Sequence, residues 1–243
     1  MSVVRATGGV LRLLWCQERS EIHYLVVNAV VLPAALTYIG FRLSDDPATR
    51  RAWIAGAVTL GIGLSAIANV AIPMLIDRFG GRLDLLRSLP LPKEAYLLAY
   101  LSLACLHSVA VVGALLLLLG AVGMLPSAAG LLSGVLPAAV ACTLAWSAIG
   151  FALAMRAPDL DRGSALTLAL GLGLGFLSPV FYAVSDLPAI VRPLAWLSPF
   201  THFADALRAT LSGAPVPTSS WAVSSLLAVV LVGSSLRLVR WHE

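Results

Sequence analysis

The stretch 53–76, "WIAGAVTLGIGLSAIANVAIPMLI", contains no aspartate, glutamate, lysine or arginine. About 20 consecutive apolar residues are enough for a helix to cross the hydrocarbon core of a bilayer. Inside that core only helices and closed barrels satisfy their own backbone hydrogen bonds. The stretch therefore predicts a transmembrane helix.

Other parts of the chain share this property and surround the first stretch on both sides. Apolar residues make up 59% of the sequence and charged residues 12%, against about 25% charged residues in an ordinary soluble domain. The sequence thus predicts an all-α membrane protein, with residues 1–243 forming one transmembrane domain. The uncharged stretches predicted to be its six transmembrane helices are 22–41, 53–76, 96–119, 131–155, 164–182 and 221–236.

Positive charge is distributed unevenly between the connections. With the N-terminus placed inside, eleven of the 16 lysine and arginine residues fall on the inner side. Cytoplasmic loops carry the excess of positive charge in membrane proteins. We therefore expect both termini to be cytoplasmic.

Residues 1–20 precede the first predicted span and contain regularly spaced arginines. Arg5, Arg12 and Arg19 recur every seven residues and share one face of a helix, with apolar residues broadly opposite. This pattern is typical of an amphipathic helix that lies in the lipid headgroup layer. The alternative is an ordinary frayed basic tail.

The loop 77–92, between the second and third spans, is the most charged part of the chain. Gly80 and Gly81 permit a sharp turn, after which Leu83, Leu86 and Leu89 recur every three residues until Pro90 ends the helix. A short apolar stripe below the membrane suits docking into a groove on a soluble partner. A solvated connector is the alternative, and spacing alone does not separate the two.

A second unusual segment is 178–200, "SPVFYAVSDLPAIVRPLAWLSPF", between the last two spans. It is apolar, yet four prolines interrupt it and Asp186 and Arg192 lie in its middle. A helical hairpin that enters the outer leaflet and turns back would explain this composition, provided that its freed backbone groups find partners. The alternative is a plain outer loop.

These two segments resemble the two signatures of permeases in the type-2 family of ABC transporters. The first match is Asp77-Arg78…Gly81-x-Leu83-Asp84-x-Leu86…Pro90-Leu91, although that family more often has Glu at position 77. The second is Pro179, then Asp186-Leu187-Pro188, then Pro199-x-Thr201-His202-x-x-Asp205-x-x-Arg208, with Phe200 where Leu is usual.

The resemblance implies the permease subunit of an exporter in a prokaryotic cell membrane. Such a subunit pairs with a second copy or a homologous permease, and a separate cytoplasmic ATPase binds the ATP and Mg²⁺. The basic N-terminal helix would lie at the inner interface, and 183–208 would be the re-entrant outer segment. The residues implied in coupling to the ATPase are Arg82, Leu83, Asp84, Leu86, Arg87 and Pro90. Those implied in the outer segment are Pro179, Asp186, Pro188, Pro199, His202, Asp205 and Arg208.

Two other functional classes remain as alternatives. An ion-coupled transporter or channel usually holds ionisable groups within its spans, but only His107 lies deep in a predicted span. A membrane-embedded enzyme could use His202, Asp205 and Arg208, which have helical spacing.

ATP hydrolysis by the chain itself is not expected, and neither is a bound metal, another cofactor or a nucleic acid. The sole lysine, Lys93, follows Pro92, so the chain has no G-x-x-x-x-G-K-[ST] phosphate loop. Cys16, Cys105 and Cys142 are scattered without metal-binding spacing, which favours a packing role.

Overall fold

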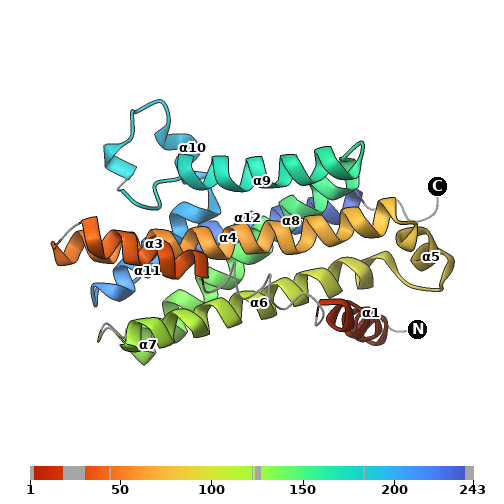
Figure 1. Ribbon diagram of the computed structural model, residues 1–243, viewed down its shortest axis with the longest axis horizontal. Helices are drawn as coiled ribbons and strands as arrows, with labels where there is room; N and C mark the ends of the chain where they lie inside the picture. The colour runs from red at the N-terminus through yellow and green to blue at the C-terminus, as the bar shows by residue number, and fades with distance from the viewer. Residues whose placement is uncertain are drawn as a thin grey trace.

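The computed structural model describes residues 3–18, 31–43, 45–121, 123, 127–182 and 184–238. Every regular element within these residues is helical, which confirms the predicted all-α class. The long helices run side by side along the longest axis of the molecule (Figure 1).

Helices α3 (Leu32–Leu43) and α4 (Pro47–Phe79) form the first antiparallel pair. Asp46 caps α4: its carboxylate accepts hydrogen bonds from the Thr49 amide at 2.8 Å and the Thr49 hydroxyl at 2.7 Å. These bonds stabilise the ionised carboxylate and lower the pKa of Asp46. Helix α4 has 33 residues and is therefore about 50 Å long, which exceeds the thickness of a bilayer's hydrocarbon core.

The next two helical segments are α6 (Lys93–Ala121) and a second, composite helix. The composite helix consists of α7 (Ala128–Gly130), a π-helical turn (Leu131–Val135) and α8 (Leu136–Arg156). Pro137 has no amide hydrogen to donate to the preceding turn, and a local change of helix type is one way to accommodate that loss.

Helix α8 occupies the centre of the bundle together with α4. The two pack closely because Gly150 has no side chain where it meets the backbone of Ile67, and the Ser147 hydroxyl donates to the Ala66 carbonyl at 3.2 Å. Helix α9 (Leu160–Leu177) packs on α4, and α12 (Thr218–Leu238) packs on α8.

Among the described residues, five helical segments are long and apolar enough to cross a membrane. They are Pro47–Phe79, Lys93–Ala114, Ala128–Arg156, Leu160–Leu177 and Thr218–Arg237. The predicted first span, 22–41, lies largely outside the described residues, apart from its last part in α3, so the count of six remains a prediction.

The predicted boundary 164–182 is wrong at its end. Helix α9 ends at Leu177, and Ser178 is extended with ψ of 142°. The cause is Pro179, whose ring disfavours the helical conformation for the residue before it.

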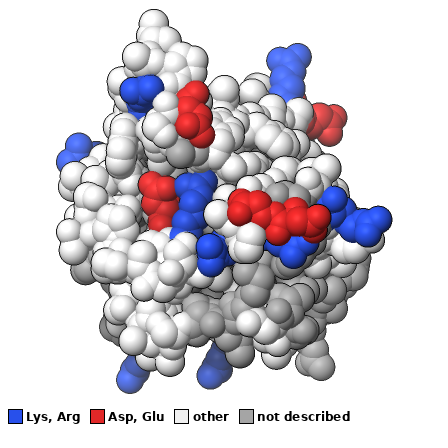
Figure 2. Space-filling model, turned by 90° about the vertical axis from the view of Figure 1, so that its left-hand side faces the viewer, with Lys and Arg blue, Asp and Glu red and all other residues white. Residues whose placement is uncertain are grey.

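The two ends of the bundle carry different short elements. At one end lie α1 (Val3–Glu18) and α5 (Arg82–Ser88), and at the other lie α10 (Arg192–Trp196) and α11 (Pro199–Leu211) (Figure 1). Figure 2 faces the α10 end, where acidic and basic side chains lie next to one another in the middle of the surface.

Helix α4 contains a glycine that makes room for the aromatic core. A Cβ at Gly63 would overlap the ring of Phe200, which is buried and stacks on Trp146 with ring centroids 4.3 Å apart. We expect Gly63→Ala to lower the free energy of unfolding by about 1–3 kcal/mol, because overpacking displaces the ring. Gly173→Ala is the matched control, since a Cβ there meets nothing within 4 Å. Thermal unfolding in detergent measures both, and equal midpoints would contradict the packing argument.

Candidate functional site

The last turn of α4 contains a carboxylate that no solvent reaches. Asp77 is 1% exposed, and its Oδ2 accepts hydrogen bonds from the Tyr100 hydroxyl at 2.7 Å and the Tyr96 hydroxyl at 3.1 Å. Its Oδ1 lies 3.3 Å from Nη1 of Arg82, the first residue of α5. Asp77 therefore joins three elements: α4, which carries it, α6, which carries both tyrosines, and α5.

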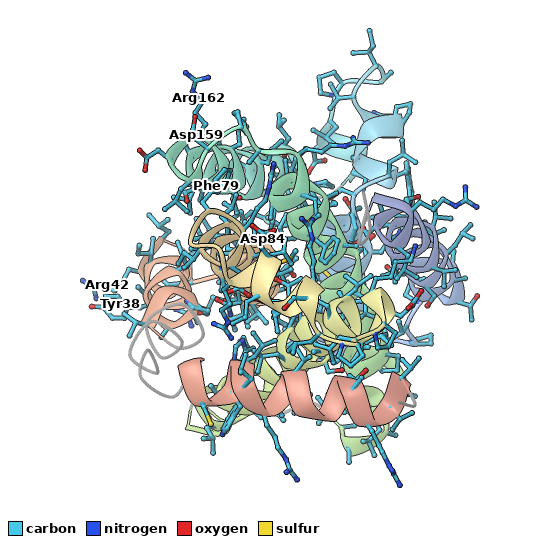
Figure 3. All side chains as sticks on the ribbon, turned by 90° about the vertical axis from the view of Figure 1, so that its right-hand side faces the viewer. Tyr38, Arg42, Phe79, Asp84, Asp159 and Arg162 are labelled. Atoms are coloured by element: carbon cyan, nitrogen blue, oxygen red, sulfur yellow. The ribbon has the colours of Figure 1, made fainter. Side chains whose placement is uncertain are left out.

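The turn between α4 and α5 matches the sequence prediction. Gly81 precedes α5 with φ of 77°, in the left-handed region that favours glycine. Helix α5 then runs from Arg82 and ends before Leu89 and Pro90. Asp84 lies in the middle of this end of the molecule (Figure 3), and Arg87 pairs with it at 3.2 Å.

The orientation of α5 differs from the sequence expectation. Leu83 and Leu86 are only 2% and 7% exposed, because both pack into the core formed with α4, α6 and α8. They fasten α5 to the bundle and so are not exposed to a partner's groove in this structure, and their role in coupling to an ATPase stays a prediction. The outward apolar side chains are Leu85, 65% exposed, and Leu89, 46% exposed.

Arg78, which follows Asp77 in the sequence, caps the C-terminal end of α8. Its Nη1 donates to the carbonyls of Ala154 and Ala157, both at 2.8 Å. These carbonyls belong to the last turn and the C-cap of α8, where no intrahelical donor remains.

Helix α1 lies across the α5 end of the bundle. Its stripe of Ala6, Val10 and Leu14 is buried and faces α6, whereas Arg5 and Arg12 are exposed. Arg19 lies outside the described residues. The predicted amphipathic helix thus exists from Val3 to Glu18.

At the opposite end, Arg208 of α11 forms hydrogen bonds with the backbone segment that follows α9. Its Nη2 donates to the carbonyls of Pro179 at 2.5 Å, Val180 at 2.6 Å and Tyr182 at 3.2 Å. Its Nη1 pairs with Asp205 at 2.7 Å. The Pro179, Asp205 and Arg208 of the second signature therefore form one cluster.

His202 of the same signature serves the junction before α11. It is buried, and its Nε2 lies 2.7 Å from the carbonyl of Trp196 at the end of α10. The neighbouring Thr201 hydroxyl donates to the Ala195 carbonyl at 2.6 Å. Pro199 occupies the first turn of α11, where a missing amide hydrogen leaves no bond unmade.

The residues of 184–192 are separate from this cluster. Asp186 and Pro188 are exposed, and Arg192 donates to the carbonyls of Ser185 at 2.9 Å and Leu187 at 3.0 Å. The segment forms a short 3₁₀ turn (Val184–Asp186) and α10. Its position relative to a bilayer remains a prediction.

Two pairs of polar side chains meet between the spans. Nδ1 of His107 on α6 lies 3.1 Å from the side-chain nitrogen Nδ2 of Asn69 on α4. The hydroxyls of Ser108 and Thr143 are 2.5 Å apart. Across the described part of the chain, no group of three or more histidine, cysteine, aspartate or glutamate residues could hold a metal.

Sequence reasoning missed the roles of Tyr96, Tyr100 and Arg78. The two tyrosines are four residues apart at the start of a span, so they share a helix face. That spacing was a usable signal, but it does not identify Asp77 as their shared partner. The acceptors of Arg78 are 76 and 79 residues away in sequence, and no local pattern points to them.

The fold and these clusters define a class first: a multi-pass membrane protein whose polar groups gather at the two ends of an apolar bundle. The family model described as ABC-2 type transporter matches residues 13–212. The chain belongs to the ABC-2 type transporter family, as a permease. None of the curated proteins compared with the chain matches it.

The Arg208 cluster makes a specific stability prediction. Arg208→Lys replaces a planar fork of donors by one compact ammonium, which cannot reach three carbonyls and Asp205 together. We expect a loss of about 2 kcal/mol of unfolding free energy, the typical cost of leaving buried acceptors unsatisfied. Arg162→Lys is the control, because Arg162 also pairs with an aspartate three residues away but is largely exposed. Unfolding midpoints in detergent give the comparison, and an equal effect of both substitutions would refute the role of the three carbonyls.

Proposed function

We propose that this permease is a subunit of an ATP-driven exporter and that a separate cytoplasmic ATPase subunit supplies the energy. The proposal rests on the way in which α5 is attached to the end of the bundle. Helix α5 presents Asp84 and Leu85 outward, and Leu89, which directly follows it, is also exposed. The first residue of α5 is ion-paired with buried Asp77.

Through this attachment, movement of α5 can be transmitted to the membrane-spanning helices. A partner that moves α5 would move Arg82, and through Asp77 it would act on α4 and α6 together, because Tyr96 and Tyr100 hold the same carboxylate. Leu83 and Leu86 support the route by packing α5 onto both helices. The coupling residues of this proposal are therefore Asp84, Leu85, Arg87 and Leu89 on the outside, with Arg82 and Asp77 behind them.

The sequence supports an external energy source in a second way. It contains no phosphate loop, and the histidine within a span, His107, has a hydrogen-bond partner in Asn69. We further propose that the chain works as a dimer in a prokaryotic cell membrane, with α1 and α5 on the cytoplasmic side and 183–208 on the outer side as a re-entrant cap on the transport path.

Docking through α5 is tested by changing its outward face. We expect Leu85→Asp combined with Leu89→Asp to abolish copurification of an ABC ATPase with the tagged full chain, because both apolar contacts of α5 are lost. Leu197→Asp, an equally exposed leucine at the opposite end, should leave copurification unchanged. Mass spectrometry identifies the copurified ATPase, and Mg²⁺-dependent ATP hydrolysis measures the amount of active complex. ATP hydrolysis by the purified chain without any partner would overturn the proposal, as would wild-type recovery of the ATPase with the double variant.

Sidedness and re-entry are tested by cysteine labelling in a variant without Cys16, Cys105 and Cys142. A membrane-impermeant thiol reagent added to intact cells should label a cysteine at Asp186 readily and one at Ile190 poorly. The protein itself covers neither position, since Asp186 is exposed and Ile190 is 85% exposed, so a difference must come from lipid. A cysteine at Asp84 should react only after the membrane is opened. Labelling at 84 from outside would invert the topology, and equal labelling at 186 and 190 would make the segment an ordinary loop.

A further inference from the structure

The permease function does not explain the exposed arginines on the outward face of α1. Ala6, Val10 and Leu14 recur every four residues and form the buried stripe toward α6. At 3.6 residues per turn, Arg5 and Arg12 fall on the opposite side of the helix. Both arginines are exposed.

The orientation of α1 determines what this face meets. In Figure 3 the spans are viewed from their ends, whereas α1 is seen along its length and lies across the edge of the bundle. A helix that lies crosswise to membrane spans runs along the bilayer surface. Its buried Val10 and Leu14 belong to one core cluster with Tyr96 and Tyr100, which lie in the first turns of a span. The outward face is therefore at the level where the hydrocarbon core gives way to headgroups.

The surface between the two arginines is open. A Cβ added at Gly8 or Gly9 would meet nothing within 4 Å. Apolar side chains flank the arginines, with Val4 81% exposed and Trp15 50% exposed. Arginine together with exposed valine and tryptophan is typical of a helix that lies in the interface of a membrane. An acidic soluble partner would account for the arginines but not for the exposed apolar side chains.

Charge along α1 also favours an anion on this face. Arg5 lies in the first turn, where the helix dipole disfavours a cation and stabilises an anion. The helix contains no acidic residue before Glu18. A bound negative group beside Arg5 would offset the unfavourable placement of this arginine.

We propose that the outward face of α1 is a binding site for anionic phospholipid headgroups of the surrounding leaflet, with Arg5 and Arg12 as the phosphate-binding residues. The arginines are seven residues apart, about 10.5 Å along the helix, so each faces its own headgroup. Lipids with a net negative headgroup are preferred, because a zwitterionic headgroup carries a cation that opposes the arginines. This site needs no ATPase partner and stands apart from the proposed coupling through α5.

Native mass spectrometry of the full chain in neutral detergent tests the site. The probe is an equimolar mixture of phosphatidylglycerol and phosphatidylcholine with identical acyl chains. We expect the wild-type chain to retain phosphatidylglycerol preferentially. R5Q/R12Q should reduce this preference by roughly 30-fold, or about fivefold per arginine, and R5K/R12K should keep most of it. The matched control, R42Q/R237Q, removes two other exposed arginines and should keep the preference.

Three results would overturn the proposal. One is an unchanged preference in R5Q/R12Q, and another is an equal loss in R42Q/R237Q, which would mean that overall charge governs lipid retention. The third is a change in oligomeric mass in R5Q/R12Q without a change in lipid preference, which would assign the face to a second copy of the chain. Circular dichroism checks that R5Q/R12Q remains folded, and the single variants R5Q and R12Q carry the test if it does not. Failure of the ATPase proposal would leave all these measurements unaffected.

Discussion

A backbone carbonyl in or near hydrocarbon has no water to bond, so each helix end there needs a donor from elsewhere in the chain. Two arginines meet this need. Arg78 donates to the carbonyls of Ala154 and Ala157 at the end of α8. Arg208 donates to those of Pro179, Val180 and Tyr182, just beyond the end of α9. Each arginine belongs to one of the two family signatures, so each signature contains a residue that closes a helix end in this chain.

The same constraint explains how the inner signature can connect a surface helix to buried spans. A buried carboxylate is costly unless it is paired and hydrogen-bonded. Asp77 meets that condition through Tyr96, Tyr100 and Arg82, which come from α6 and α5. Satisfying one charge therefore ties three helices together at the place where the proposed ATPase partner would act.

The fold class and the turn between α4 and α5 could be predicted from the sequence. What each helix face packs against could not. The spacing of Leu83 and Leu86 predicted an apolar stripe suited to a soluble partner's groove, whereas the chain's own core covers both residues. Periodicity does not say what covers such a stripe, because a partner's groove and the chain's own core are equally apolar. Within the described residues, five helices long and apolar enough to cross a membrane overlap predicted spans. The end of α9 differed because Pro179 ends the helix before the apolar run ends.

The sequence by itself determined that this chain is a helical membrane protein, that 53–76 lies in a helix long and apolar enough to cross a bilayer, and that a turn falls at Gly80 and Gly81. These features depend on residues close together in the chain, because helix length, apolar runs and proline effects are local. Only the tertiary structure decided which polar groups meet. Asp77 accepts a hydrogen bond from Tyr100, 23 residues away in sequence. Arg208 donates to Pro179, 29 residues away, and Arg78 donates to Ala157, 79 residues away. Such pairs form when packing brings helix ends together, and local sequence carries no record of that geometry.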